Sequence, residues 1–248
     1  MKRHAVVVGA SSGIGAAIVT ELARTGFSVS ALGRRHGQAP AERWIPCDVS
    51  DQTSVDDAIA RCLVEGETPS AVVYAAGAPA MGRTLDVPEA ARREAFEVNF
   101  WGLERVVRGF YPAMARAGQG TIVAVSSIAA LRPVPFESYY AASKAAAARW
   151  LGCFAPEAAL AGVRVRIVAP GYIPTGFLER GGWYGMSVPA GSGSGVTAED
   201  VARTVCAVAL GRRARTVLGW RETTITLADR LLPGAYDRLL ERRMRKKR

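Results

Sequence analysis

Short apolar runs alternate with longer helical segments along the chain, and this alternation constrains the fold more than any other feature of the sequence. The apolar runs are rich in Val, Ile and Ala and lie at residues 4–8, 27–32, 43–46, 70–75, 120–126, 163–168 and 216–220. Segments with helical periodicity separate them, at about 13–25, 51–65, 88–117, 137–160 and 197–211. Apolar strands with helices between them indicate a parallel sheet that is covered on both faces. The sequence therefore predicts an α/β fold, doubly wound around a central seven-stranded parallel sheet.

The length and composition fit one domain. The chain has 248 residues, 49% of them hydrophobic, which is enough to bury a sizeable core. No apolar run reaches the ~20 residues that a membrane-spanning helix needs. The start, Met1-Lys2-Arg3-His4, has the charge order of a signal peptide, but the apolar stretch behind it ends after four residues at Gly9. We therefore expect residues 1–248 to form a single cytoplasmic domain that begins with a strand.

The cysteine and histidine content argues against several kinds of site. The four cysteines form no C-x-x-C pair, which is typical of reduced thiols in a cytosolic protein: Cys47, Cys62, Cys153 and Cys206. The chain has two histidines, His4 and His36. We therefore expect no disulfide framework, no metal site and no Ser-His-Asp hydrolase.

A glycine-rich turn joins the first strand to the first helix, with the sequence Val8-Gly9-Ala10-Ser11-Ser12-Gly13-Ile14-Gly15. In this setting Gly9 permits a tight turn, Gly13 allows the backbone to approach a pyrophosphate, and Gly15 lets the helix pack closely on the sheet. The helix N-terminus then offers free N–H groups and the positive end of its dipole to phosphates. The Gly-Lys-Ser/Thr ending of a nucleoside triphosphate loop is absent from the turn, so a nucleoside triphosphate is disfavoured as the ligand.

Tyr140 and Lys144 lie four residues apart in an expected helix, so their phenol and ammonium groups share one helix face. The pKa of an isolated phenol, about 10, makes it a poor acid–base catalyst at neutral pH. A nearby Lys⁺, joined by the positive nicotinamide of an oxidised cofactor, favours the phenolate and lowers that pKa. Tyr139 has Ser143 four residues on, not a cation, so we predict that Tyr140 is the catalytic residue.

The glycine turn, spaced G-x-x-x-G-x-G, and the Y-x-x-x-K motif together resemble the short-chain dehydrogenase/reductase family, over roughly residues 5–210. The resemblance implies a Rossmann-type oxidoreductase in which Ser127 stabilises charge on the substrate oxygen. Its neighbour Ser126 is expected to satisfy backbone groups at the strand end. Asn99 matches the family asparagine that holds a water in the proton relay, although a mid-helix Asn is otherwise a surface residue or a local kink.

The resemblance also implies which residues bind the cofactor. They lie in the glycine turn, after later strands and on the Y-x-x-x-K helix: Gly9, Ser11, Ser12, Gly13, Ile14, Gly15, Arg34, Arg35, Asp48, Val49, Ala75, Ala76, Gly77, Tyr140, Lys144, Pro170, Gly171, Ile173 and Thr175. Asp48 has an alternative or additional role as the N-cap of the helix that follows it. Pro170 and Gly171 are otherwise ordinary turn residues.

The end of the second strand predicts the choice of cofactor. NAD enzymes place a carboxylate there to accept hydrogen bonds from the adenosine ribose. In this chain Gly33-Arg34-Arg35-His36 occupies that place, and no acidic residue appears before Glu42. Arg34 can pair with a 2′-phosphate in bidentate geometry. We therefore predict NADP(H), the alternative being that these arginines are solvated surface residues.

One element departs from the family pattern. The family usually has Asn-Asn-Ala-Gly after its fourth strand, where this chain has Tyr74-Ala75-Ala76-Gly77. Ala76 and Gly77 keep the backbone path beside the adenosine, but the side-chain amides that brace the sheet are lost. We expect the departure to affect stability more than catalysis.

A segment rich in Gly and Ser, residues 176–196, follows a strand end, where a substrate lid is usual and a plain connection is the alternative. Five residues in or near it are expected to form an apolar substrate pocket: Phe136, Phe177, Trp183, Tyr184 and Met186. A hydrophobic ketone is therefore a more natural substrate than a sugar.

The positive charge of the chain is concentrated at its C-terminus. The net charge is +10, and Arg238 to Arg248 supplies +6 of it with seven Lys/Arg against one Glu. The body therefore lacks the basic surface of a nucleic-acid-binding fold, and we expect no nucleic-acid partner. The basic amphipathic extension, residues 222–248, suits a cap over the substrate cleft, an oligomer contact, an anionic membrane surface or an acidic acyl carrier protein. A solvated charged helix is the remaining interpretation.

These observations predict an NADP(H)-dependent oxidoreductase that interconverts a ketone or aldehyde and an alcohol. The resemblance favours reduction of a hydrophobic or acyl-type ketone by a homodimer or homotetramer. Two alternatives stay open: a non-catalytic NADP(H)-binding scaffold or sensor, and a peripheral membrane-surface protein that acts through the basic extension.

Overall fold

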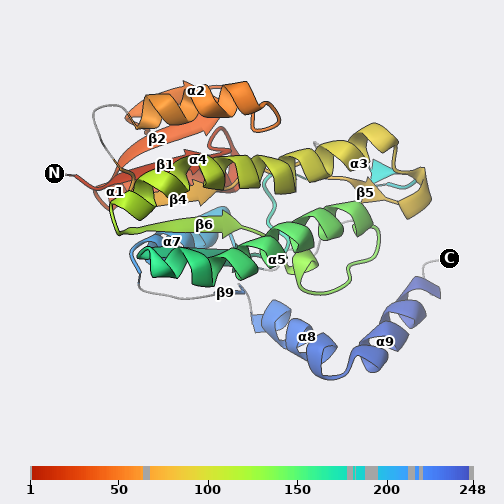
Figure 1. The fold of residues 1–248 in the computed structure, drawn as a ribbon. Coiled ribbons are helices and arrows are strands. Elements are labelled where there is room, and N and C mark those ends of the chain that lie inside the picture. The colour runs from red at the N-terminus through yellow and green to blue at the C-terminus, as the bar shows by residue number, and fades with distance from the viewer. Residues whose placement is uncertain are drawn as a thin grey trace.

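A parallel sheet of seven strands forms the centre of the protein, in the order β3-β2-β1-β4-β6-β7-β9, as the sequence predicts (Figure 1). The computed structural model describes residues 2–63, 68–177, 181, 183–187, 195–211, 216–217 and 220–245. The strands are β1 (His4–Val8), β2 (Ser28–Gly33), β3 (Arg43–Pro46), β4 (Ala71–Tyr74), β6 (Gly120–Val125), β7 (Val163–Ala169) and β9 (Thr216–Val217). The strand expected at 216–220 is described at Thr216–Val217, and its expected last residue, Trp220, begins a helix instead.

The strand order reverses at β1. On one side β1 pairs with β2, with Val6 opposite Ser30, and on the other side it pairs with β4, with Val6 opposite Val72. In open parallel sheets, ligands bind outside the carboxyl ends of the strands at such a reversal point. The topology therefore brings the segments that follow β1 and β4 to the place where a ligand is expected.

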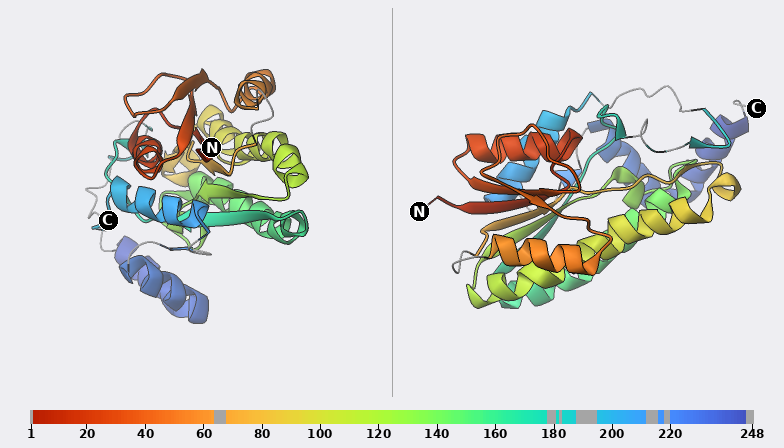
Figure 2. Two further views of the ribbon diagram at one scale, coloured as in Figure 1. Left: turned by 90° about the vertical axis from the view of Figure 1, so that its left-hand side faces the viewer. Right: turned by 90° about the horizontal axis from the view of Figure 1, so that it is seen from above.

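Helices cover both faces of the sheet (Figure 2). One face carries α2 (Gln52–Cys62), α4 (Gly102–Arg116) and α5 (Ser138–Leu160), and the other carries α1 (Gly13–Arg24) and α7 (Ala198–Ala209). Because successive side chains of a strand point to opposite faces, Val6 and Val8 pack with the first group, and Ala5 and Val7 with the second. This double burial explains why β1 is apolar at successive positions.

The expected helix at 88–117 is two helices joined by a π-helical turn. The turn η3 (Glu97–Trp101) contains Asn99 and lies between α3 (Glu89–Phe96) and α4. Such turns add a residue to the helix and are frequent at functional sites. The apolar pattern of the sequence did not reveal this π-helical turn. Val98 within the turn and Leu103 just after it are both buried, so the apolar pattern continues through the turn.

Helix starts follow local hydrogen-bond rules, with one correction. Thr197 and Asp200 form a capping box at the start of α7. The N-cap of α2 is Asp51, whose carboxylate accepts hydrogen bonds from two backbone N–H groups, so the N-cap role considered for Asp48 is wrong. Asp48 instead accepts a hydrogen bond from the backbone N–H of Ser50 at 2.9 Å.

Smaller elements lie outside the main sheet. The short strands β5 (Met81–Gly82) and β8 (Trp183–Tyr184) pair in parallel, and η2 (Thr84–Asp86) and η4 (Ile128–Ala130) are single 3-10 turns. At the C-terminal end, α8 (Trp220–Leu231) and α9 (Pro233–Arg245) form a hairpin that projects from the body (Figure 1). Within the described part of the chain, no helix is long and apolar enough to cross a membrane.

Candidate active site

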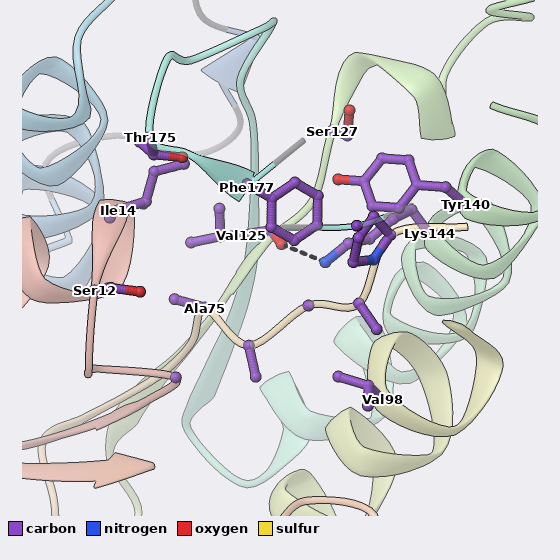
Figure 3. Close-up of a pocket in the computed structure, with 18 of the residues that line it drawn as sticks. Ser12, Ile14, Ala75, Val98, Val125, Ser127, Tyr140, Lys144, Thr175 and Phe177 are labelled. Carbon is purple, nitrogen blue, oxygen red and sulfur yellow. Dashed lines mark hydrogen bonds between the residues drawn. The ribbon is translucent and has the colours of Figure 1, made fainter. Parts of the chain in front are cut away.

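A pocket of about 560 Å³ opens at the carboxyl ends of the parallel strands, at the point where their order reverses. Residues that follow β1, β2, β3, β4, β6 and β7 line it, together with residues of α5. Figure 3 shows the glycine turn, marked by Ser12 and Ile14, on one side of the pocket and Tyr140 with Lys144 on the other. The two sequence motifs therefore meet in one site.

The glycine turn is packed so closely that side chains are excluded. Gly9 has a φ of +82°, and a Cβ at this position would lie 2.4 Å from the backbone nitrogen of Ala76. A Cβ at Gly15 would lie 2.0 Å from the backbone oxygen of Gly9. The N-terminus of α1 consequently sits directly against the end of β1, with its free N–H groups at the pocket, where they suit a phosphate.

Every residue that was expected to bind the cofactor lines this pocket. The set is Gly9, Ser11, Ser12, Gly13, Ile14, Gly15, Arg34, Arg35, Asp48, Val49, Ala75, Ala76, Gly77, Tyr140, Lys144, Pro170, Gly171, Ile173 and Thr175. These residues come from separate loops and helices that meet only because parallel strands end at the same edge.

Arg34 and Arg35 directly follow β2 and line the pocket. Both side chains are exposed, and neither forms an ion pair with a described residue. Asp48 lines the pocket too, but its carboxylate accepts a hydrogen bond from the backbone of Ser50 in its own loop. Two exposed guanidinium groups suit an additional phosphate at this end.

Ser127, Tyr140 and Lys144 lie together at the opposite end (Figure 3). Tyr140 and Lys144 share the face of α5 that points into the pocket, and both are buried. The Lys144 Nζ donates a hydrogen bond to the Val125 carbonyl at 3.3 Å. The Ser127 hydroxyl accepts one from the backbone N–H of Ala129 at 3.1 Å. In Figure 3 the Tyr140 hydroxyl lies on the side of its ring that faces Ser127.

Burial dominates the electrostatics at this end of the pocket. Burial raises the pKa of Tyr140 above its ordinary value, the charge of Glu137 raises it further, and polar contact with Ser127 lowers it. Burial also lowers the pKa of Lys144 to about 8. In the protein alone burial dominates, and the pKa of Tyr140 stays above its ordinary value.

Asn99 lies behind the pocket wall and is fully buried, so the interpretation as a surface residue is wrong. Its Oδ1 accepts a hydrogen bond from the Ala78 N–H at 3.0 Å, and its Nδ2 donates to the Ala78 carbonyl and to the Ser143 hydroxyl, both at 2.9 Å. A Cβ at Gly77 would lie 3.3 Å from the Asn99 Oδ1 and 3.5 Å from the Lys144 Nζ. Asn99 thus joins the loop after β4 to α5, next to Lys144.

Tyr74 takes over the bracing that the missing amides would supply. Its side chain is 1% exposed, and its hydroxyl donates a hydrogen bond to the Val98 carbonyl at 2.5 Å. Gly102 leaves the room for that hydroxyl, since a Cβ there would lie 2.8 Å from it. A single phenol therefore ties β4 to the π-helical turn that carries Asn99.

The neighbours of Tyr140 and Ser127 have different surroundings. Tyr139 packs outside the pocket, where the guanidinium of Arg92 lies 5.5 Å from its ring centroid. Ser126 is buried, and its hydroxyl has no hydrogen-bond partner among the described residues, so the expectation that it satisfies backbone groups is wrong. The backbone N–H of Ser126 makes the bond to β7 instead.

The substrate end of the pocket is mixed, not purely apolar. The rings of Phe177 and Tyr140 lie 5.8 Å apart, and Tyr184 and Met81 also line this end. Two acidic side chains, Glu94 and Glu137, line it as well. Sequence reasoning missed both, because neither belongs to a motif.

The lid was predicted only in part. Within 176–196, Phe177, Gly181 and Tyr184 line the pocket, whereas 178–180, 182 and 188–194 lie outside the described residues. Trp183 and Met186 are absent from the described lining, and so is Phe136. Trp183 precedes Tyr184 in β8, and neighbouring strand residues point to opposite sides.

Comparison with known proteins identifies the family. Residues 3–181 match the family model described as short chain dehydrogenase. The chain belongs to the short chain dehydrogenase family. The resemblance inferred from the two motifs is thereby confirmed, and with it the expectation of an oxidoreductase enzyme.

Relatives of this short chain dehydrogenase resemble it over most of its length. Dehydrogenase/reductase SDR family member 7B from Danio rerio is 28% identical over 264 residues, which cover 97% of this chain and 85% of the relative. A short-chain dehydrogenase from Streptomyces avermitilis has a TM-score of 0.82 and 25% identity, with 100% of each chain covered. Another short chain dehydrogenase, from Burkholderia cenocepacia J2315, was solved in complex with NADP. It has a TM-score of 0.82 and 28% identity, and the match covers 96% of this chain and 98% of that one.

Proposed function

We propose that this short chain dehydrogenase interconverts a ketone or aldehyde and the corresponding alcohol with NADP(H), acting as a single Rossmann-fold domain of residues 1–248. One observation supports this most: Ser127, Tyr140 and Lys144 converge on the same pocket as the glycine turn. A cofactor held by the turn and a carbonyl group held by Tyr140 would share one site. Residues 176–196 serve as the substrate lid in this proposal.

Each side chain has a role in the proposed reaction. The cofactor, when bound, supplies or accepts the hydride. Tyr140 donates its phenol proton to the substrate oxygen during reduction and removes it during oxidation. Ser127 hydrogen-bonds the same oxygen and stabilises its developing charge. Lys144 binds the nicotinamide ribose, and Asn99 orders the water that returns a proton to Tyr140.

The residues present fit NADP(H). A side chain at Gly9 or Gly15 would clash with the backbone that holds the turn against the N-terminus of α1, so the turn keeps its backbone N–H groups at the pocket only with glycine at these positions. Arg34 and Arg35 are exposed at the adenosine end, where a 2′-phosphate would lie. The relative from Burkholderia cenocepacia binds NADP. These observations support NADP(H) over NAD(H).

Cofactor choice is tested by fluorescence titration with NADPH and NADH. We expect the wild type to bind NADPH much more tightly than NADH. Arg34→Ala should lower the affinity for NADPH by about 10- to 100-fold, since a hydrogen bond to a charged group contributes about 1.5–3 kcal/mol. NADH affinity should change little. Arg93→Ala is the matched control, because Arg93 is exposed on α3 and pairs with Glu89. Equal affinities of the wild type for the two cofactors would contradict the proposal.

Catalysis is tested with a pair of neighbouring tyrosines. Tyr140→Phe should lower kcat at least about 100-fold, the typical contribution of general acid–base catalysis, with NADPH affinity nearly unchanged. Tyr139→Phe, outside the pocket, should keep the wild-type rate. Retained turnover in Tyr140→Phe would overturn the mechanism. Tight NADPH binding without turnover of any ketone, aldehyde or acyl thioester would favour the scaffold or sensor alternative.

We also propose a cytoplasmic homodimer or homotetramer. The outer face of α4 and α5 supports an assembly, because Trp101 is 49% exposed there and Trp150 stacks on Phe154 beside it. Light scattering after size-exclusion chromatography tests this, and a mass of 26.3 kDa in solution would contradict it. Cell fractionation tests the location.

The C-terminal hairpin favours a second candidate function, contact with an anionic membrane surface. Leu227, Leu231 and Leu232 are 53%, 68% and 64% exposed, next to the basic extension. Removing residues 238–248 should abolish sedimentation with phosphatidylglycerol vesicles and leave NADPH binding intact. Leu160→Ser, at a still more exposed site on α5, is the control for Leu231→Ser. Vesicle binding that survives the truncation would exclude this function, and binding of an acidic acyl carrier protein instead would favour the protein partner.

A further inference from the structure

The segment between η4 and α5 is held in an unusual backbone conformation at the pocket wall. Phe136 has a φ of 70°, the one positive value of a non-glycine residue in the described part of the chain. A bulky residue in that region is a true outlier, and such strain costs about 1–3 kcal/mol and concentrates at functional sites. The Phe136 carbonyl accepts a hydrogen bond from the Gly82 N–H at 2.8 Å, which fixes the turn to β5. The next residue is Glu137.

Glu137 faces the pocket with an unused carboxylate. It occupies the N-cap position of α5, but its side chain makes no capping hydrogen bond. Within the described residues the carboxylate has neither a hydrogen-bond donor nor an ion-pair partner. It is partly buried, it lines the pocket, and it lies three residues before Tyr140, on the same helix face. Glu137 and Tyr140 line the same pocket, and the charge of Glu137 raises the pKa of Tyr140.

The cation near Glu137 is engaged elsewhere. Arg132 lowers the pKa of Glu137 by its charge, but burial has the larger effect and raises that pKa to about 7. The Arg132 Nη1 donates a hydrogen bond to the Tyr236 hydroxyl at 2.5 Å, and its guanidinium lies 5.9 Å from the Tyr236 ring centroid. The Tyr236 hydroxyl in turn donates to the Pro133 carbonyl at 3.1 Å. Tyr236 of α9 therefore holds Arg132 in a position from which it makes no ion pair with Glu137.

We propose that Glu137 determines substrate specificity by accepting a hydrogen bond from a hydroxyl or ammonium group that the substrate carries a few atoms from its carbonyl carbon. This proposal rests on the proposed carbonyl–alcohol function and names its substrate class. The substrate is an amphipathic ketone or alcohol: its apolar part lies against Phe177 and Met81, and its donor group meets Glu137 beside Tyr140.

The physical reason is the cost of an unpaired acid. A carboxylate that loses water without gaining a donor is unfavourable, and natural proteins rarely leave such a group unpaired. A substrate donor supplies the missing bond, whereas a plain hydrocarbon ketone leaves the carboxylate desolvated and unpaired. A site that hydrogen-bonds a polar group of its substrate strongly rejects analogues that lack this polar group. An apolar pocket discriminates much less against a substrate that lacks one methylene group. Glu94, exposed at the mouth of the pocket, keeps its water and does not discriminate in this way.

The test compares acetophenone with acetophenones that carry a hydroxymethyl or an aminomethyl group at the meta or the para position. The kcat/KM for NADPH oxidation is measured for the wild type, Glu137→Gln, Glu137→Ala and Glu157→Gln. Glu157 is the matched control, because it is exposed on the same helix α5. Calorimetric affinities of the same compounds give a second readout that does not require turnover.

For the wild type we expect at least one donor-bearing isomer to exceed acetophenone by roughly 10- to 100-fold, the strength of a hydrogen bond to a charged group. Glu137→Ala should bring this ratio to within about threefold of unity, and Glu157→Gln should preserve it. Glu137→Gln keeps an acceptor without charge, so it should retain a preference for hydroxymethyl and lose one for aminomethyl. That difference distinguishes a hydroxyl from an ammonium partner.

Failure of the two proposals looks different. If ketones are reduced but no isomer is preferred, or if the ratio is the same in Glu137→Ala, the role of Glu137 is wrong and the oxidoreductase function stands. If nothing is reduced, the proposed function fails, and the calorimetric comparison still decides whether Glu137 binds a donor. Equal affinity for acetophenone and all its substituted isomers would overturn the proposal in either case.

Discussion

Replacing Tyr74 with phenylalanine removes one buried hydroxyl and leaves the ring in place. The hydroxyl donates to the Val98 carbonyl at 2.5 Å, in a site that is 1% exposed. Burial raises the pKa of Tyr74, so the group remains a protonated donor at every working pH. Gly102 leaves room for this hydroxyl, because a Cβ there would lie 2.8 Å from it. The space that the Tyr74 hydroxyl leaves in the variant is too small for a water molecule that could replace it. The Val98 carbonyl therefore loses its hydrogen-bond donor.

The expected cost follows from that geometry. A buried hydrogen bond that is broken by removing one partner costs about 1–3 kcal/mol. For a chain of this size, a loss of about 2 kcal/mol lowers Tm by about 4–8 °C. Differential scanning calorimetry of Tyr74→Phe and the wild type measures the shift at fixed protein concentration. Since the bond ties β4 to the π-helical turn, hydrogen exchange should also become faster in residues 97–101.

Tyr111→Phe is the matched control. Tyr111 lies partly buried on α4, its ring contacts Phe154 with centroids 4.9 Å apart, and its hydroxyl has no hydrogen bond to a described residue. Its replacement should change the free energy of unfolding by no more than about 0.5 kcal/mol. If Tyr74→Phe shifts Tm no more than Tyr111→Phe does, Tyr74 does not replace the missing amides and the reasoning is refuted.

Three further predictions concern the pocket and the thiols. Lys144→Met should abolish turnover yet raise the free energy of unfolding at pH 7 by about 1–3 kcal/mol, because burial lowers the pKa of Lys144 to about 8 and disfavours its charged form. The stability gain of the variant should be full below pH 8 and vanish as the pH approaches 10.5, where the lysine of the wild type is neutral in both the folded and the unfolded state. Denaturant unfolding of both proteins at several pH values checks the direction of this change. Gly15→Ala should destabilise by about 1–3 kcal/mol and weaken NADPH binding in the titration, because its Cβ would lie 2.0 Å from the Gly9 oxygen. In the native protein a disulfide reagent at pH 8 should modify the exposed Cys153 rapidly and Cys47 only on unfolding, since burial raises the pKa of Cys47 to about 12; rapid labelling of Cys47 would contradict the packing under β3.

The sequence by itself determined the framework of the site. The order of strands and helices, the glycine turn and the spacing of Tyr140 and Lys144 all depend on rules that act within a few residues: the period of a strand or helix, the φ that Gly9 adopts, and the i, i+4 geometry of one helix face. These rules were enough to predict the seven-stranded sheet and to reveal the two motifs, and the family resemblance that these motifs carry pointed to residues that all line the pocket.

Only the tertiary structure decided the environment of those residues. The π-helical turn buries Asn99 against Ala78 and Ser143, Tyr74 reaches Val98 in place of the family amides, and Asp51 rather than Asp48 caps α2. Neither motif indicated Glu137. Its carboxylate has no partner among the described residues, and this depends on Tyr236, which engages Arg132 from the far end of the chain. The pKa of Tyr140 likewise depends on how much water the fold removes from it and which charges it brings near. Desolvation and contacts between distant segments exist only once the chain is packed, so no local pattern in the sequence carries them.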